Sequence, residues 1–268
     1  MTESPATGYA LITGASSGIG SAFAEALAES GRDLVLVARS KQALVSRATE
    51  LSTRYGVHAV PYALDLTQPG AVRELATMLS DDGFTIDFLV NNAGFGTQGR
   101  FDRIDPERDH DQVLLNVVTV VDLCHALVPG MVARGQGTVV NVGSMGGFQP
   151  APYLAVYGAT KAFILSFSQA LAGEIEDTGV RVLALCPGPV MTSFFDVLGS
   201  THAAVGQQLT AEQVVAAGLR GLKRGRRVVV PGWQNKITAN AARLLPRRTM
   251  VAIAKRSVGL DIWVPPAN

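Results

Sequence analysis

Short, almost continuous apolar runs alternate with longer segments of helical periodicity, and this alternation limits the fold more than any other feature. The run DLVLVA at 33–38 has no polar residue after its first, as expected for a strand with both faces covered. Strands that alternate with helices in this way form a parallel sheet with helices on both faces. We therefore predict an α/β fold with a doubly wound, mainly parallel sheet. Strands are expected at 9–13, 33–38, 57–64, 86–91, 137–142, 180–186 and 227–230, and helices at 19–30, 40–55 (with Ser40 as the N-cap), 69–79, 107–134 (broken near Pro129), 156–178 and 211–223.

The size and composition of the chain fit one domain of this kind. It has 268 residues, 47% of them hydrophobic, and no linker, low-complexity tract or internal repeat divides it. We expect a single domain over 1–268. The net charge is +1, which gives no whole-molecule field to attract nucleic acid, so nucleic-acid binding is not expected.

Three features predict a location in the cytoplasm. Cys124 and Cys186 lie far apart without a CxxC pair, and we interpret them as buried free thiols in a reducing compartment. The start MTESPATGY lacks the basic residues and apolar stretch of a signal peptide. No uninterrupted apolar run reaches the ~18 residues that cross a bilayer. No metal site is expected.

A glycine-rich turn, TGASSGIG at 13–20, separates the first expected strand from the first expected helix. Gly14 permits a tight turn, Gly18 lets backbone approach a pyrophosphate, and Gly20 lets the helix pack close to the sheet. The free N–H groups at the helix start would face the phosphates. Small residues also suit ordinary packing turns, but the position between strand and helix favours a Rossmann-type dinucleotide site.

The second expected strand ends in Ala38 and Arg39. An acidic residue at this place would bind the ribose 2′-hydroxyl of NAD, whereas arginine suits the 2′-phosphate of NADP through its charge and planar donors. The alternative interpretation of Arg39 is a solvated surface charge. We expect NADP(H) to be preferred, with NAD(H) as the alternative.

Three polar residues form a candidate proton-transfer group. Ser144 follows the strand GTVVNV, and Tyr157 and Lys161 lie one helical turn apart in YGATK. A tyrosine with a pKa of ~10 is a poor base at neutral pH, but a nearby ammonium favours the phenolate. The pair could then exchange a proton with an alcohol or ketone oxygen that Ser144 also holds. Tyr-x-x-x-Lys pairs are common on helices, so specificity depends on the other motifs.

Together these motifs resemble the short-chain dehydrogenase/reductase family in its smaller, single-domain form. The resemblance covers roughly 9–192, in the family's order and spacing, and 193–268 would form the substrate loop and a C-terminal helical segment. It implies an NAD(P)-dependent oxidoreductase that transfers hydride between nicotinamide and a carbonyl or secondary alcohol carbon. The matching segments are TGASSGIG, Asp65-Leu66, NNAG at 91–94, Asn116, Ser144, YGATK at 157–161 and PGPVMT at 187–192.

The resemblance also implies a role for each matching position. Asn116, Ser144, Tyr157 and Lys161 would be catalytic, with Asn116 holding a proton-relay water and Lys161 also binding the nicotinamide ribose. The other positions would bind the cofactor: Gly14, Ser16, Ser17, Gly18, Ile19 and Gly20 at the adenosine and phosphates, Arg39 and Ser40 at the 2′-phosphate, Asp65 and Leu66 at adenine, Asn92, Ala93 and Gly94 beside it, and Pro187, Gly188, Val190 and Thr192 at the nicotinamide ring.

The substrate is expected to be apolar: steroid-like, acyl or a small ketone. The runs YLAVYGATKAFILSFSQAL and VVVPGW resemble the branch of the family that contains steroid and fatty-acyl ketone reductases. Large apolar side chains near the motif ends suggest an apolar pocket, although each alone fits ordinary packing. These are Phe95, Phe148, Tyr153, Met191, Phe194, Phe195, Val197 and Leu198.

Residues 234–258 combine apolar residues with Arg243, Arg247, Arg248, Lys255 and Arg256. A basic amphipathic helix of this kind can lie on a membrane surface. Pro246 interrupts it, so packing on the domain or on a neighbouring subunit is favoured.

Two other kinds of protein share some of these motifs. A non-catalytic dinucleotide sensor would need TGASSGIG but not Asn116, Ser144, Tyr157 and Lys161 together. A sugar-nucleotide epimerase or dehydratase can share the Tyr–Lys pair, but usually has other glycine spacing and more than the ~75 residues that follow PGPVMT here. The resemblance implies a homodimer or homotetramer through the helix at 156–178.

Overall fold

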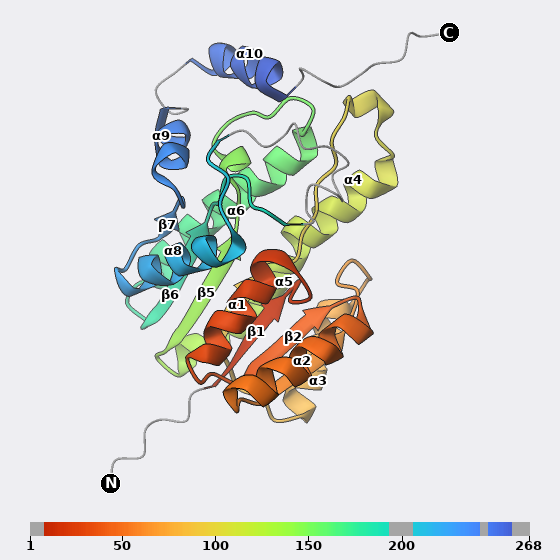
Figure 1. Cartoon of the computed structure of the whole chain (residues 1–268), viewed down its shortest axis with the longest axis vertical. Helices are drawn as coiled ribbons and strands as arrows, with labels where there is room; N and C mark the ends of the chain where they lie inside the picture. Colours follow the sequence, from red (N-terminus) through yellow and green to blue (C-terminus); the bar gives the residue numbers. More distant parts are fainter. Residues whose placement is uncertain (1–7, 193–205, 242–245, 259–268) are drawn as a thin grey trace.

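A computed structural model describes residues 8–192, 206–241 and 246–258, and shows a seven-stranded sheet (Figure 1). Every strand pairs with its neighbours in parallel, in the order β3-β2-β1-β4-β5-β6-β7. The predicted doubly wound parallel sheet is confirmed. The strands are β1 Tyr9–Thr13, β2 Leu34–Ala38, β3 Ala59–Ala63, β4 Ile86–Asn91, β5 Gly137–Val142, β6 Val180–Leu185 and β7 Val228–Val229.

Helices cover both faces of the sheet, and each face has its own hydrophobic core. One core contains side chains of α1, α2 and α8, and the other contains side chains of α3, α5 and α6. Strand β2 is apolar throughout because both of its faces are buried. Leu34 and Leu36 enter the first core, and Val35 and Val37 enter the second. These helices are α1 Gly18–Glu29, α2 Lys41–Tyr55, α3 Ala71–Asp81, α5 Thr119–Ala133, α6 Ala155–Glu174 and α8 Ala211–Lys223.

The long helix predicted over 107–134 is interrupted, but not near Pro129. It consists of α4 Pro106–Val113, a π-helical segment η2 Leu114–Val118, and α5, which continues through Pro129. The π-helical turn therefore surrounds Asn116, one of the predicted catalytic residues. Such turns insert one extra residue and often occur at functional sites.

The continuous helical segment Pro106–Ala133 is long and apolar enough to cross a membrane, with a mean hydropathy of 1.8. Core helices of soluble proteins share this property. Here one side of the segment packs inward, because Val120, Leu123, Val128 and Met131 belong to the core that contains β4 and β5.

Two helices follow β7 and lie in the upper part of the view in Figure 1. They are α9 Trp233–Ala241 and α10 Arg247–Val258. Pro246 lies directly before α10, and its carbonyl accepts a hydrogen bond of 3.1 Å from Met250 N. The proline thus begins the second helix, as its fixed φ allows. Short 3₁₀ turns at Phe101–Arg103 (η1) and Met145–Gly147 (η3) complete the described secondary structure.

Candidate active site

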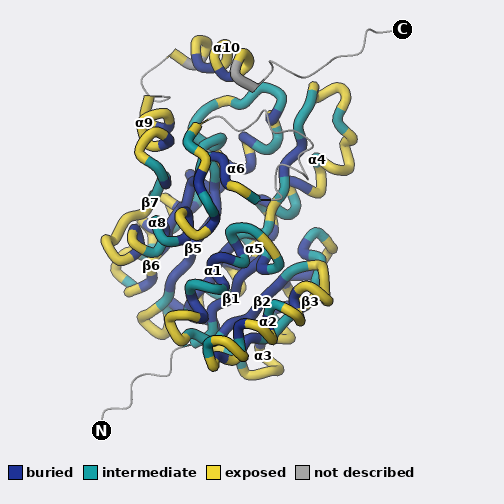
Figure 2. Tube along the Cα trace, in the orientation of Figure 1, coloured by how far each residue is buried: buried dark blue, intermediate teal, exposed yellow. Residues whose placement is uncertain are grey.

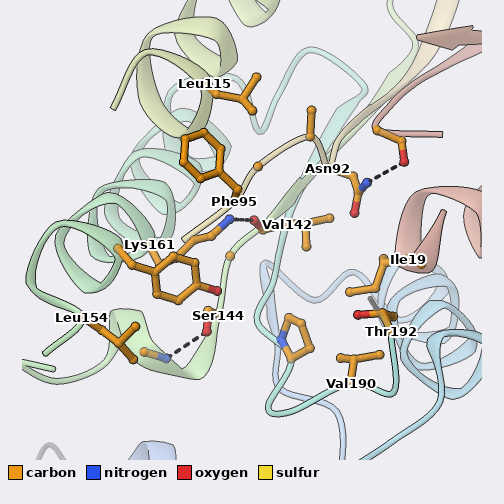
Figure 3. Close-up of a pocket in the computed structure, with 18 of the residues that line it drawn as sticks. Ile19, Asn92, Phe95, Leu115, Val142, Ser144, Leu154, Lys161, Val190 and Thr192 are labelled. Carbon is orange, nitrogen blue, oxygen red and sulfur yellow. Dashed lines mark hydrogen bonds between the residues drawn. The ribbon is translucent and has the colours of Figure 1, made fainter. Parts of the chain in front are cut away.

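A cavity of about 1240 Å³ opens at the carboxyl ends of the strands. It lies where β1 pairs with both β2 and β4, so the chain turns to opposite sides of the sheet at this place. Ligands of open α/β sheets bind at such a switch point. All predicted site residues except Gly20 and Asn116 line this cavity. Figure 3 shows Ser144 and Lys161 on one wall, with Ile19, Val190 and Thr192 across from them.

The glycine-rich turn has the geometry that a bound phosphate requires. Gly14 and Gly18 have φ values of +65° and +55°, which favour glycine. A Cβ on Gly20 would lie 2.5 Å from Asn92 Nδ2 and would also overlap the carbonyl oxygen of Gly14. Ser17, the N-cap of α1, makes no capping hydrogen bond through its side chain. The first N–H groups of α1 therefore remain available to an anion, and the turn fits a pyrophosphate.

Hydrogen bonds fix the turn against the end of β4. The hydroxyl of Thr13 accepts from Asn92 N at 3.0 Å and Ala93 N at 2.9 Å, and donates to Val90 O at 3.3 Å. Asn92 Nδ2 donates to the carbonyls of Thr13 and Gly14 at 3.0 and 3.3 Å. Asn92 thus fixes the turn itself, while Ala93 and Gly94 line the cavity.

The far end of the cavity carries a free cation and no carboxylate at the end of β2. Arg39 is exposed there and makes no ion pair with another described residue. Ser40 lies beside it, and its hydroxyl caps α2 by accepting from Ala43 N at 3.4 Å, as the predicted N-cap should. Asp65 Oδ1 accepts from the N and Oγ1 atoms of Thr67 at 3.0 and 2.8 Å. This end therefore fits an adenosine with a 2′-phosphate.

Ser144 and Tyr157 meet on one wall of the cavity. The Ser144 hydroxyl caps η3 by accepting from Gly146 N at 3.1 Å, and it also forms a hydrogen bond with Tyr157. Burial raises the pKa of Tyr157, and the hydrogen bond with Ser144 acts in the opposite direction. The structure thus holds Tyr157 in its protonated form at neutral pH.

Lys161 is buried behind these two residues. Its Nζ donates to the carbonyl of Val142 at 2.9 Å (Figure 3). The same atom lies 5.8 Å from the centroid of the Tyr157 ring. Burial lowers the pKa of Lys161 to about 8. We expected Lys161 to lower the pKa of Tyr157; in the described residues burial dominates, and that pKa is raised instead.

Asn116 is buried in η2 and does not line the cavity. Its Nδ2 donates to Phe95 O at 2.9 Å and to Thr160 Oγ1 at 3.1 Å, and its Oδ1 accepts from Phe95 N at 3.2 Å. The side chain therefore joins the segment after β4 to the residue that precedes Lys161. That Asn116 holds a relay water stays a prediction.

The remaining wall is mostly apolar and includes helices that sequence reasoning did not place there. Phe95, Leu115, Phe148 and Leu154 line it, as do Thr238 and Ala239 of α9 and Met250, Ile253 and Ala254 of α10. The i, i+3, i+4 spacing of the three α10 residues was the available signal. Arg108 and Asp111 of α4 add charges to the lining.

Part of the predicted apolar pocket lies elsewhere. Met191 and Tyr153 do not belong to the cavity lining, and Met191 is 56% exposed. Phe194, Phe195, Val197 and Leu198 lie outside the described residues, as does Arg243.

The sheet, the glycine-rich turn and the Ser–Tyr–Lys wall together define a dinucleotide-binding protein of the oxidoreductase class. The chain matches the short chain dehydrogenase family over residues 8–203. It belongs to that family.

Three relatives show the range of the likeness. A very-long-chain 3-oxoacyl-CoA reductase of Laccaria bicolor is 36% identical over 178 residues, which are 65% of this chain and 52% of the relative. Sulfoacetaldehyde reductase 2 of Chromohalobacter salexigens is 37% identical over 69% of this chain and 73% of the relative. A short-chain dehydrogenase from Sphingobium yanoikuyae, solved in complex with NADPH, is 34% identical, with a TM-score of 0.80 over 97% of this chain and 98% of that one. The chain thus spans about half the length of the acyl-CoA reductases that it matches.

Proposed function

We propose that this protein is an NADP(H)-dependent oxidoreductase that interconverts a carbonyl compound and its alcohol. The observation that carries the proposal is one cavity with the glycine-rich turn and Arg39 at one end and Ser144, Tyr157 and Lys161 at the other. A dinucleotide sensor would not need that second group. The reductases among the relatives support the same reaction class.

The mechanism follows from the positions of three side chains. When bound, NADP(H) supplies or accepts the hydride at the substrate carbon. In the reducing direction the Tyr157 hydroxyl donates its proton to the carbonyl oxygen, which yields the alcohol. Ser144 hydrogen-bonds to the same oxygen while negative charge develops there. The Lys161 ammonium stabilises the phenolate that remains, because it lies within 6 Å of the Tyr157 ring.

The preference for NADP(H) rests on Arg39 and on the NADPH-bound relative. A charge-assisted contact with the 2′-phosphate is worth about 1.5–3 kcal/mol, or roughly ten- to a hundredfold in affinity. Calorimetric titration of the protein with NADPH and NADH measures this difference. Equal or tighter binding of NADH contradicts the preference, and Arg39→Ala should remove the difference without weakening NADH.

The proposed substrate is apolar and either acyl-like, steroid-like or a small ketone. The side chains of Phe95, Leu115, Phe148 and Leu154 support this, and the acyl-CoA reductases agree with it. Long-chain 3-oxoacyl thioesters, steroid ketones and small aldehydes should be assayed for NADPH oxidation, with Tyr157→Phe as the inactive control. A substrate that only the wild type turns over supports the proposal. A panel on which both proteins behave alike contradicts it.

We also propose a cytoplasmic homodimer or homotetramer in which α6 contributes to the interface. Phe163 of α6 is 38% exposed and stacks on Phe167 at 5.7 Å, so this helix presents an apolar surface. The buried free thiols of Cys124 and Cys186 support a reducing compartment. Sedimentation at micromolar concentration tests the assembly, and a monomer contradicts it. Cell fractionation tests the location.

A further inference from the structure

Charge is distributed very unevenly along the chain. Residues 213–260 contain eleven of the 23 Lys and Arg and none of the 22 Asp and Glu, although the net charge of the whole chain is +1. The rest of the chain is therefore acidic. Six of these cations follow β7, so this last part of the chain carries a local positive charge that can attract anionic surfaces and that the overall charge conceals.

Helix α9 exposes large apolar side chains within this basic region. Trp233 and Ile237 are 67% and 60% exposed and lie one helical turn apart. Lys236 is exposed on the same side, whereas Asn235 and Ala239 are buried on the other. A tryptophan beside an aliphatic residue and a lysine is the composition of helices that lie at the interface between lipid and water.

Helix α10 has two different faces. Met250, Ile253 and Ala254 face the cavity, and Met250 and Ala254 are buried. Arg248, Lys255 and Arg256 are exposed on the opposite side, and none of them forms an ion pair with another described residue. Figure 2 shows exposed residues along the outer sides of both α9 and α10. These six side chains, Trp233, Lys236, Ile237, Arg248, Lys255 and Arg256, are called the C-terminal surface below.

We propose that the C-terminal surface docks on a bilayer that contains anionic phospholipid. The four cations complement lipid phosphates. Trp233 and Ile237 enter the headgroup region, where their apolar side chains are removed from water. A nucleic acid would match the charge but not Ile237. Helices α9 and α10 line the cavity with their inner sides. Docking through their outer sides therefore places the apolar end of the cavity next to the lipid. This inference goes beyond the proposed reaction and does not depend on it.

The experiment measures binding of the full chain to vesicles, without cofactor or substrate. The protein is sedimented with vesicles of phosphatidylcholine alone, and with vesicles in which about a third of the lipid is phosphatidylglycerol. We expect binding to the anionic vesicles, weakened by added salt because the charges are exposed. In a Trp263→Phe background Trp233 is the sole tryptophan, and its fluorescence should shift to shorter wavelength on binding.

Two charge variants distinguish this surface from basic charge in general. Arg248→Gln/Lys255→Gln/Arg256→Gln removes three cations of the C-terminal surface and should lower vesicle affinity about 100-fold or more. Lys223→Gln/Arg224→Gln/Arg226→Gln removes three exposed cations at the end of α8 and just after it, and should change the vesicle affinity by less than about threefold. Equal losses in both variants, or no binding of wild type to anionic vesicles, overturns the proposal. The surface could instead join two copies of the chain. If the wild type does not bind vesicles and the first variant sediments as a smaller species than the wild type, the proposal is overturned.

Discussion

At the scale of single residues, burial controls the chemistry of the site. Tyr157 and Lys161 both lie in surroundings that disfavour their charged forms, so the pKa of the phenol is raised and that of the ammonium is lowered. Burial therefore moves the two pKa values apart: that of Lys161 falls to about 8, while that of Tyr157 lies above its usual ~10. At neutral pH Tyr157 thus carries the proton that it gives to a substrate oxygen.

Removing the Tyr157 hydroxyl should abolish most of the activity and leave the fold intact. In Tyr157→Phe we expect turnover to fall about 10²–10⁴-fold, because a positioned acid/base is lost while the ring still fills its place. Steady-state rates and calorimetric NADPH binding measure the two effects. Tyr153→Phe is the matched control, since Tyr153 does not line the cavity. Near wild-type turnover by folded Tyr157→Phe would show that another group donates the proton.

Replacing the buried lysine should stabilise the protein without cofactor, in a way that depends on pH. Below pH 8 Lys161 is charged in both states, and its burial costs free energy on folding. Between about pH 8 and its unfolded pKa of ~10.4, the folded state loses the proton first, so the stability of the wild type rises with pH. Lys161→Met should therefore be about 1–3 kcal/mol more stable at pH 7, and this gain should shrink by pH 9.5. Urea unfolding at both values checks it, and a gain that is independent of pH contradicts it.

At the scale of elements, the turn before α1 and the π-helical segment η2 position the site. Both depend on close contacts, at Gly20 in the first and at Asn116 in the second, that other side chains could not make. The predicted strands at 9–13, 86–91 and 137–142 have their expected bounds, because apolar runs with turn residues on either side are a clear signal. The break in the long helix could not be predicted from its sequence. Proline is the usual sequence signal for a helix break, yet α5 continues through Pro129. The extra residue of a π-helical turn has no such signal in the sequence.

Gly20 tests the packing of α1 on the turn. In Gly20→Ala the new Cβ would overlap the Gly14 carbonyl, so α1 must move away from the turn. The N–H groups at the start of α1 would then no longer point at the phosphate site. We expect a loss of about 1–3 kcal/mol in stability and at least tenfold weaker NADPH binding. Gly173→Ala in α6 is the control, because no atom lies within 4 Å of its Cβ. That change should stabilise by up to about 1 kcal/mol. Equal effects of the two changes, by urea unfolding, would contradict the packing role.

Asn116 tests the connection from η2 to the wall of the cavity. Asn116→Ala leaves Phe95 and Thr160 without three hydrogen bonds and should cost about 2–3 kcal/mol, measured as a lower urea midpoint. Asn116→Asp keeps the acceptor for Phe95 N and should preserve more of the stability than the alanine variant does. An alanine variant as stable as wild type would mean that these bonds contribute little.

At the scale of the whole molecule, the sequence predicts the sheet well but does not predict which helices cover the apolar end of the cavity. The motif residues reach one cavity because the carboxyl ends of parallel strands share one edge, so spacing along the chain was sufficient. Helices α9 and α10 close the apolar end, yet nothing in their sequence specifies the direction from which they approach. For the same reason the sequence does not show that Met191, although inside the motif PGPVMT, lies outside the cavity.

The position of β1 in the sheet has a consequence for synthesis on the ribosome. This strand emerges before the other six strands of the sheet, but one of its two neighbours is β4, with Ala10 beside Phe88. At about 5–20 residues per second, roughly 4–16 seconds pass before the second neighbour has been made. During that time an apolar strand has an unpaired edge that other chains can bind. Among the strands with a neighbour on both sides, β1 therefore waits longest for its second neighbour, and its apolar edge needs protection during that time.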